Sequence, residues 1–425
     1  MSIIKKYVPK FIINFFLNLE SFIENKFCFF VARRLRYLLF PLRYLVLKFN
    51  IVFVWNVAEG SGHIVSDIDN FLRKKKLGLI DKKKKYVFVR KSSSYLSYNF
   101  LKAYPDLFSY GVTNSFIYYL ALPLILSFEE LSIDVGLSRL KISLNRKDSI
   151  KLDSNLWQIS KKDGYKQWLD YLELRNRSDN YIPLRRGKFD KKILYKLNLI
   201  NNKYILIHIK TNVMNATAKA GNIKDFLPTI NYFLNNSYKV VMIGPELKSL
   251  DSLKMLNNPN FINYGNSNHQ SFYNDLILFR YSFLSIVSGS GIGWLADVMN
   301  KPMIYTNYWH LATPPYNKYI INLPTLVKSK TNNKFLKFKD QYYLYLNKLK
   351  DVGPELFPHD KYIPVNPSAE QLLDASIECI NNIEFNVNKP STNHVRFNNI
   401  DSNGYSKFIK SRISENFLKT NNNLL

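Results

Sequence analysis

The stretch FLSIVSGSGIGWLADVMNKPMIYTN (residues 283–307) decides how the chain folds. Its first part, residues 283–287, is an apolar run typical of a buried strand, and residues 288–291 are all small. Residues 292–299 then carry apolar side chains at helical spacing, and Pro302 leads into a second apolar run at residues 303–305. The stretch therefore predicts a strand, a loop, a helix and a second strand.

The loop between the first strand and the helix is Ser288, Gly289, Ser290 and Gly291. Small residues let a ligand approach the backbone, and the N–H groups and dipole of a following helix favour a negative charge there. The loop is suited to a nucleotide diphosphate. A tight turn that only brings the helix close to the sheet explains the same glycines. A dinucleotide fingerprint would need a further glycine where Trp294 stands, so NAD binding is disfavoured.

Length and composition indicate a folded protein with room for two domains, at 425 residues and 46% hydrophobic residues. The formal net charge of +28 raises nucleic-acid binding as a possibility. The chain is also rich in Lys, Asn, Ile, Tyr and Phe, a bias that an AT-rich genome produces by itself, and no nucleic-acid recognition motif is present. We therefore expect no nucleic-acid partner.

Basic clusters alternate with apolar and aromatic runs in residues 1–50, a mixture suited to an anionic membrane surface. We expect a basic amphipathic leader that contacts the membrane peripherally, with a basic-faced helical subdomain as the alternative.

Residues 111–128 carry no charge but include Asn114 and Pro123, so a buried helix is favoured over a transmembrane span. The start lacks a secretory cleavage pattern, and the two thiols, Cys28 and Cys379, suit a reducing cytoplasm.

The first half of the chain opens with a second strand, glycine loop and helix. Residues 51–55 read as a strand and Glu59 to His63 as the loop. A helix with one apolar face follows and ends in the basic run before Gly78. Further elements expected there are a strand at residues 86–89 and helices at 94–104 and 115–128. Residues 175–187 are polar, basic and interrupted by Pro183, which predicts an interdomain linker.

The second half predicts strands at residues 204–209, 240–243, 261–263, 283–287 and 303–305, separated by helices such as 225–235. Such alternation is typical of an α/β fold with a parallel sheet, whose ligands bind outside the carboxyl ends of the strands. Ser368 and Gln371 form a capping box that begins a helix reaching about residue 383. Beyond residue 388 the chain is rich in Asn and Ser, and we expect a mobile polar tail.

Residues 264–308, YGNSNHQSFYNDLILFRYSFLSIVSGSGIGWLADVMNKPMIYTNY, resemble the signature of an uncharacterised bacterial family of glycosyltransferases found among surface-polysaccharide genes. Residues 62–73 and 204–246 agree with the same family. The resemblance implies the GT-B architecture, with two Rossmann-like domains facing across a cleft. Within it we expect an acceptor domain (51–185) and a nucleotide-sugar domain (186–385). The resemblance does not cover the leader (1–50) or the polar tail (386–425).

The resemblance implies transfer of a sugar from a nucleotide-sugar donor to a lipid-linked or growing surface glycan, such as capsule or lipopolysaccharide. It implies no metal and no bound cofactor. Together with the leader, it predicts a location on the inner face of the cytoplasmic membrane. The family tends to have an Arg-Asn pair after the first strand of the second domain, where this chain reads NATAKAGN (residues 215–222). Either Lys210 or Lys219 replaces the arginine as the partner of the phosphate, or the donor specificity has shifted. A lysine would act as a point charge, whereas an arginine can form two parallel hydrogen bonds.

Candidate residues follow from these patterns. The donor candidates are Lys210, Lys219, Gly244, Glu246, Ser288, Gly289, Ser290 and Gly291. The candidates for the base that takes the acceptor proton are His63, Glu59 and Asp67. Other residues that follow strand ends or lie in the signature are His208, Asn266, Ser271, Asp275, Trp294 and Trp309, for which buried hydrogen bonding or core packing is at least as good an explanation.

Each leading candidate has an ordinary structural alternative as well. Lys210 fits a solvated lysine at a strand end, and Asp67 and Asp69 fit carboxylates that favour the start of a helix. Two other functions also stay open. A nucleotide-sugar epimerase of the same architecture would use the same loop without an acceptor, and a basic protein that binds nucleic acid or membrane would explain the charge.

Overall fold

The structure is a computed structural model of the whole chain. It describes residues 27–55, 61–89, 98–104, 111–112, 115–135, 141–143, 150–151, 158–160, 164–186, 189–201, 203–210, 217–244, 258–351, 357–385, 390–401 and 407–425. Two of the candidate residues, Glu59 and Glu246, lie outside these ranges, as does most of the leader.

A seven-stranded sheet organises the second half, in the order β10-β9-β8-β11-β12-β13-β16. All of its pairings are parallel. The strands are β8 (Tyr204–His208), β9 (Lys239–Ile243), β10 (Phe261–Asn263), β11 (Leu284–Ser288), β12 (Met303–Thr306), β13 (Ile320–Leu323) and β16 (Arg412–Ile413). The five predicted strands and the parallel sheet are confirmed, whereas β13 and β16 were not predicted.

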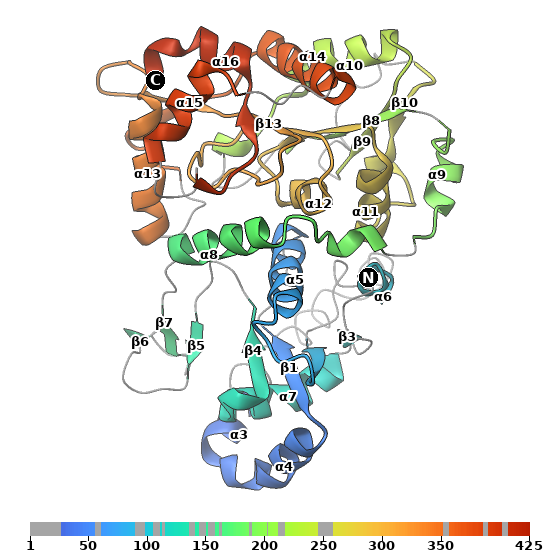
Figure 1. Cartoon of the computed structure of the whole chain (residues 1–425), viewed down its shortest axis with the longest axis vertical. Coiled ribbons are helices and arrows are strands. Elements are labelled where there is room, and N and C mark those ends of the chain that lie inside the picture. The colour runs from blue at the N-terminus through green and yellow to red at the C-terminus, as the bar shows by residue number, and fades with distance from the viewer. Residues whose placement is uncertain are drawn as a thin grey trace, which may run out of the picture.

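Helices cover both faces of this sheet, because its central strands are apolar on both sides and fully buried. On one face lie α10 (Ile223–Asn235) and α14 (Ala369–Phe385), and on the other α11 (Phe272–Tyr281) and α12 (Trp294–Val298). The predicted capping box is confirmed, since Ser368 N donates to Gln371 Oε1 at 3.0 Å and Gln371 N to Ser368 Oγ at 3.2 Å. Figure 1 shows the two helix layers above and below the sheet.

The first half contains a smaller parallel sheet in the order β3-β2-β1-β4. Its strands are β1 (Ile51–Trp55), β2 (Lys85–Val89), β3 (Gly111–Val112) and β4 (Ser132–Asp134). The helices are α5 (Ser61–Lys76), α6 (Tyr98–Lys102) and α7 (Ser115–Ser127). The predicted β1, β2 and α5 are confirmed. No helix in the described part of the chain is long and apolar enough to cross a membrane.

Helix α5 lies between the two sheets, and one hydrophobic core runs through it (Figure 1). Its predicted apolar face is buried together with Phe88 of the smaller sheet, Leu206 of the larger sheet and Leu295 of α12. The expected open gap is therefore filled where α5 passes, because a sixteen-residue helix with a continuous apolar stripe packs against both halves. The domain boundaries stay a prediction.

A buried ion pair ties helix α8 (Gly164–Arg177) to α12. The Arg175 guanidinium pairs with the Asp297 carboxylate, and Arg175 Nη2 donates to Asp297 O at 3.0 Å. The other carboxylate oxygen of Asp297 accepts the Asn317 N–H at 2.8 Å. Arg175, which the sequence placed at the start of a polar linker, is thus part of the core because Asp297 neutralises its charge.

The expectation of a mobile tail is wrong for the described residues after 388. They form α15 (Thr392–Asn398), β16 and α16 (Glu415–Thr420), and β16 extends the large sheet by pairing with β13. Ile413, Phe417 and Leu418 are buried in the core of that sheet. Three well-spaced apolar side chains thus outweigh the polar composition of the segment.

The remaining described elements are peripheral to these sheets. The leader residues form α3 (Cys28–Arg34), a 3-10 turn η2 (Arg36–Leu39) and α4 (Phe40–Lys48). Two antiparallel groups are β14 (Leu326–Ser329) with β15 (Tyr362–Val365), and β5 (Lys141–Ser143), β7 (Gln158–Ser160) and β6 (Ile150–Lys151). Two further helices are α9 (Lys192–Lys196) and α13 (Phe338–Asp351).

Candidate functional site

The carboxyl ends of β8, β9 and β11 meet at one edge of the seven-stranded sheet, because these strands are neighbours and parallel. Lys210 follows β8, Gly244 follows β9, and the loop from Ser288 follows β11. The structure therefore brings together donor candidates that are far apart in sequence. Their role in binding stays a prediction.

The loop after β11 is held by hydrogen bonds to its neighbours on both sides. The buried Ser288 Oγ accepts the Lys210 backbone N–H at 2.6 Å, and Gly289 N donates to Thr306 O at 2.8 Å. A Cβ on Gly289 would lie 2.5 Å from the Asn307 carbonyl oxygen and 3.1 Å from the Lys219 side chain. Only glycine fits at this position, where the backbone of one strand end passes directly under the lysine stem.

Lys219 reaches this edge on a short turn, η5 (Thr217–Lys219), that is fixed from three sides. Gly221 N donates to Lys210 O at 2.8 Å, and Asn366 Nδ2 donates to Ala220 O at 2.7 Å. Thr325 Oγ1 lies 3.0 Å from Asn366 Oδ1. These bonds hold Lys219 beside Gly289, so the two candidate lysines flank the loop after β11.

Two histidines near these lysines are kept neutral. Burial, together with the charge of Lys210, lowers the pKa of His208 to about 4. Burial and the charge of Lys219 lower the pKa of His310 to about 3. The edge thus has a positive field and two uncharged imidazoles. His310 was not among the predicted residues, although its place four residues after β12 is the signal that could have found it.

The helix after the loop differs from the expectation. A 3-10 turn, η9 (Gly291–Gly293), precedes α12, which has only five residues. Gly293 N donates to Ser290 O at 3.2 Å, so this N–H group is used within the turn. The helix dipole available to an anion is therefore smaller than that of a long helix. Most of the positive potential at this edge comes from the lysines instead.

Gly291 lies at the contact between the two halves of the chain. A Cβ on Gly62 would be 2.6 Å from Gly291 Cα and 2.7 Å from Gly291 O, so the two backbones touch. Gly291 is nevertheless exposed on its other side. Of the loop residues, Ser288 and Gly289 are thus buried, and only Ser290 and Gly291 reach solvent beside α5.

The base candidates differ in how accessible they are. His63 is half-buried in the first turn of α5, directly after the residue that touches Gly291, whereas Asp67 one turn later is fully buried. Only His63 of the two reaches solvent in this structure. Asp69 is structural, since its Oδ2 accepts from Arg73 Nε and from the Tyr171 hydroxyl, both at 2.7 Å.

Several of the other polar and aromatic candidates are used in packing. Trp294 stacks on Trp168 with ring centroids 5.1 Å apart, and Trp309 is fully buried. Ser271 caps α11, because its Oγ accepts the Asn274 N–H at 3.2 Å. Burial raises the pKa of Asp275 to about 7.

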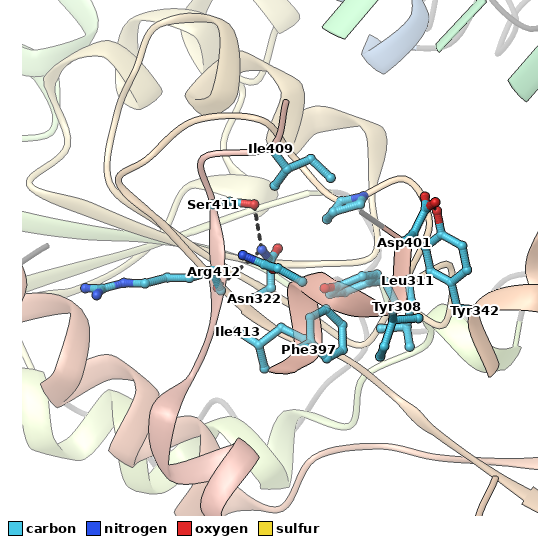
Figure 2. A pocket seen from close by; sticks show the side chains of 13 residues that line it. Tyr308, Leu311, Asn322, Tyr342, Phe397, Asp401, Ile409, Ser411, Arg412 and Ile413 are labelled. Carbon is cyan, nitrogen blue, oxygen red and sulfur yellow. Dashed lines mark hydrogen bonds between the residues drawn. The ribbon is translucent and has the colours of Figure 1, made fainter. Parts of the chain in front are cut away.

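The pocket in Figure 2 lies beside strands β13 and β16, and none of the donor or base candidates lines it. Asn322 Nδ2 donates to Ser411 Oγ at 2.8 Å in its wall, while Asp401 accepts from the Tyr342 hydroxyl. Its volume of about 30 Å³ is that of roughly one water molecule. It is too small for a nucleotide sugar.

No protein-family model matches the chain, and no curated protein matches it either. Among solved structures, it is similar to a glycosyl transferase family 9 protein from Veillonella parvula, with 12% identity, 78% of this chain and 96% of that chain covered, and a TM-score of 0.46. The E. coli ADP-heptose lps heptosyltransferase II is similar with 10% identity, coverage of 79% and 99%, and a TM-score of 0.44. A second E. coli heptosyltransferase has 10% identity, coverage of 71% and 97%, and a TM-score of 0.37.

Proposed function

We propose that the chain is a glycosyltransferase of the GT-B type, which moves a sugar from a nucleotide-sugar donor to a lipid-linked or growing surface glycan such as capsule or lipopolysaccharide. It does so at the inner face of the cytoplasmic membrane, without a metal or a resident cofactor. The sequence resemblance of residues 264–308 supports the reaction class. The geometry at the carboxyl edge of the large sheet supports the place of the donor.

The observation that carries this proposal is that the Lys210 backbone contacts Ser288 and the stem of Lys219 lies against Gly289. Glycosyl transfer leaves a nucleoside diphosphate, and the negative charge that develops on it needs stabilisation. Lys210 after β8 and Lys219 on η5 supply positive charge at the carboxyl edge of the parallel sheet, where ligands of such sheets bind. Gly289 leaves room at this site, because any side chain there would meet the Asn307 carbonyl oxygen.

The acceptor would approach from the side of α5. Because Gly62 touches Gly291, the next residue, His63, lies beside the candidate donor loop. An imidazole in this position is suited to take the proton from the acceptor hydroxyl as it attacks the sugar. Asp67, one helical turn on and buried, would act through His63 instead of on the acceptor itself.

Donor binding tests the lysine pair. Thermal shift with a panel of UDP-, GDP-, CMP- and ADP-sugars first identifies the donor, and the affinity of that donor is then measured for Lys210→Ala and Lys219→Ala. We expect each variant to lose roughly tenfold or more, as for a hydrogen bond to a charged group. Lys224→Ala, an exposed lysine on α10, is the matched control and should bind normally. Full affinity of both site variants, or no binding of any donor, would overturn the proposal.

Product analysis with and without a lipid-linked acceptor separates transfer from epimerisation. A transferase releases its nucleoside diphosphate only when an acceptor is present, whereas an epimerase converts the donor without one. His63→Gln should lower transfer by about 10²–10⁴-fold while donor affinity stays unchanged. A converted nucleotide sugar in the absence of acceptor would instead support the epimerase.

A further inference from the structure

The elements α3, η2 and α4 display an unusual number of apolar side chains on their outer surface. We call these residues the tip patch: Phe27, Phe30, Leu35, Tyr37, Leu38, Phe40, Leu42, Tyr44, Leu45, Leu47 and Phe49, which are between 37% and 81% exposed. None of the residues of η2 or α4 is buried. Large exposed apolar patches on a folded protein mark sites of interaction, in contrast to apolar side chains that are scattered singly.

The tip patch is held firmly from its inner side. Cys28 and Ala32 pack with Leu122 and Leu126 of α7, and Ser127 Oγ donates to Ala32 O at 3.1 Å. The exposed apolar side chains therefore belong to a docked structure and not to a detached segment.

Two arginines connect the other end of the tip to the short segment between α7 and β4. The guanidinium groups of Arg36 and Arg43 lie 5.1 and 5.3 Å from the ring centre of the buried Phe128. Arg43 Nε also pairs with Glu130 at 2.6 Å. The same segment is thus anchored on its inner face and uncovered on its outer face.

Helix α7 extends the apolar surface. Its second half is buried, but Ile117 is 42% exposed and Leu120 is 59% exposed, and α3 packs directly on this helix. Figure 1 shows α3, α4 and α7 gathered at the end of the molecule opposite α10 and α14. The patch is therefore a terminal surface that can meet a flat partner without obstruction from the large sheet.

The charge around the tip patch selects the partner. Residues 27–50 contain no Asp or Glu, and Arg34, Arg36 and Lys48 are exposed there. Basic side chains among aromatic and aliphatic ones are the composition of helices that lie in the interface of an anionic bilayer. Exposed tyrosines such as Tyr37 and Tyr44 suit the same interface, since their rings are apolar and their hydroxyl groups reach water.

We propose that the tip patch docks the molecule on an anionic lipid bilayer, with the apolar side chains of α3, η2 and α4 inserted at the boundary between head groups and acyl chains. This inference depends on the tip alone and not on sugar transfer. It orients the molecule with the smaller sheet next to the membrane and the large sheet away from it (Figure 1).

Vesicle sedimentation of the full chain tests the apolar part. We compare vesicles of phosphatidylcholine with vesicles containing about 30% phosphatidylglycerol, and expect strong partition only onto the second. Tyr37→Glu with Leu38→Glu should reduce that partition about tenfold or more. The matched control is Tyr195→Glu with Phe385→Glu, two side chains that are 67% and 72% exposed elsewhere, and it should bind as the wild type does.

A second pair of variants tests the charge. Arg34→Gln with Lys48→Gln should weaken binding to the anionic vesicles by about fivefold for each charge. Lys337→Gln with Lys339→Gln removes the same charge from an exposed helix start elsewhere and should have no such effect. Thermal melting of each variant verifies that the surface changes leave the fold intact.

The inference is overturned if the wild type fails to bind anionic vesicles, or if the tip variants bind them as well as the wild type does. It is also overturned if the tip variants convert a dimer to a monomer without changing vesicle binding. The last result would assign the patch to a second copy of the chain. Binding to an oligonucleotide that the same variants abolish, without vesicle binding, would assign it to nucleic acid. Lys219→Ala should bind anionic vesicles as the wild type does, because a defect in donor binding leaves the tip patch unchanged. Failure of one proposal can then be told from failure of the other.

Discussion

Two strand–glycine–helix units of this chain look alike in sequence and differ in structure. After β1, the helix α5 has sixteen residues and runs through the core between the sheets. After β11, the helix α12 has five residues and begins only after a 3-10 turn. The glycines differ too, because Gly62 of α5 makes room for the backbone of Gly291, whereas Gly289 makes room for Asn307 and Lys219.

The difference teaches that tertiary neighbours decide what a glycine turn does. Gly62 lets one half of the molecule pack against the other, which is a structural use. Gly289 lies buried at the sheet edge against the Lys219 stem, and the loop reaches solvent only at the next two residues, Ser290 and Gly291. We therefore assign the proposed anion site to the turn after β11, and the turn after β1 supplies His63 beside it.

The largest expected effect concerns how the short helix α12 is held. Asp297→Ala removes the buried partner of Arg175 and leaves an unpaired charge in the core, so we expect a loss of about 3–5 kcal/mol in the free energy of unfolding. Urea denaturation followed by circular dichroism measures it. Glu130→Gln at the exposed pair with Arg43 is the control, with a loss below about 1 kcal/mol. Equal losses for the two variants would mean that the buried pair does not hold α12.

Local patterns predicted the strands of the large sheet because each is an apolar run followed by a turn signal. The short strands β13 and β16 escaped, since two to four residues carry little pattern and β16 pairs with a strand about ninety residues earlier. Lys219 was predicted from its place in a loop, but its contact with Gly289 depends on Thr325 and Asn366, which are remote in sequence. The packing of Gly62 on Gly291 could not be predicted either, because no local pattern specifies which helix fills the space between two sheets.

The second prediction concerns the contact between Gly62 and Gly291. In Gly62→Ala, the added methyl group would lie within 2.7 Å of two backbone atoms of Gly291, so the helix or the loop must shift. We expect a loss of about 1–3 kcal/mol in the free energy of unfolding, as for other overpacked sites. Gly293→Ala is the milder comparison and should lose less, because its methyl group would meet side-chain atoms of Met303 and Val287 at 3.3 Å, which can shift by a few tenths of an ångström. If Gly62→Ala proves as stable as the wild type, α5 is not pressed against the loop.

Acid should weaken the sheet edge through His208. Its pKa is about 4 in the folded protein and 6.5 when unperturbed, so only the unfolded chain takes up a proton between these values. Stability from this group is therefore present above pH 6.5 and is lost as the pH falls towards 4. At pH 5.5 the loss is about 1.4 kcal/mol, and His208→Asn should remove that part of the pH dependence.

The control for this experiment is the half of the molecule around α5. Asp69 and Arg73 there are already paired, and neither takes part in the titration of His208. Asp69→Asn removes this pair but keeps His208, so the fall in stability between pH 6.5 and 4 that His208 contributes should persist in that variant. An unchanged acid slope in His208→Asn would show that other groups control the sheet edge.

The smallest effects concern how the two helices end. Helix α5 ends in a Schellman motif, in which Leu79 N donates to Lys74 O at 2.9 Å and Gly78 has a φ of +73°. Helix α12 ends in the same motif, in which Lys301 N donates to Ala296 O at 2.9 Å, but Asn300 adopts the left-handed conformation with a φ of +52°.

Replacing each of these residues by alanine compares the two ends directly. Gly78→Ala should lose about 1 kcal/mol of unfolding free energy, because nothing lies within 4 Å of the new methyl group and only the left-handed backbone opposes it. Asn300→Ala should lose about half as much, since asparagine already bears part of that strain. Urea titration of both variants measures the difference. A larger loss at Asn300 would mean that its side chain, and not the backbone conformation, stabilises the end of α12, and the two helix ends would then differ as much as the two glycine turns do.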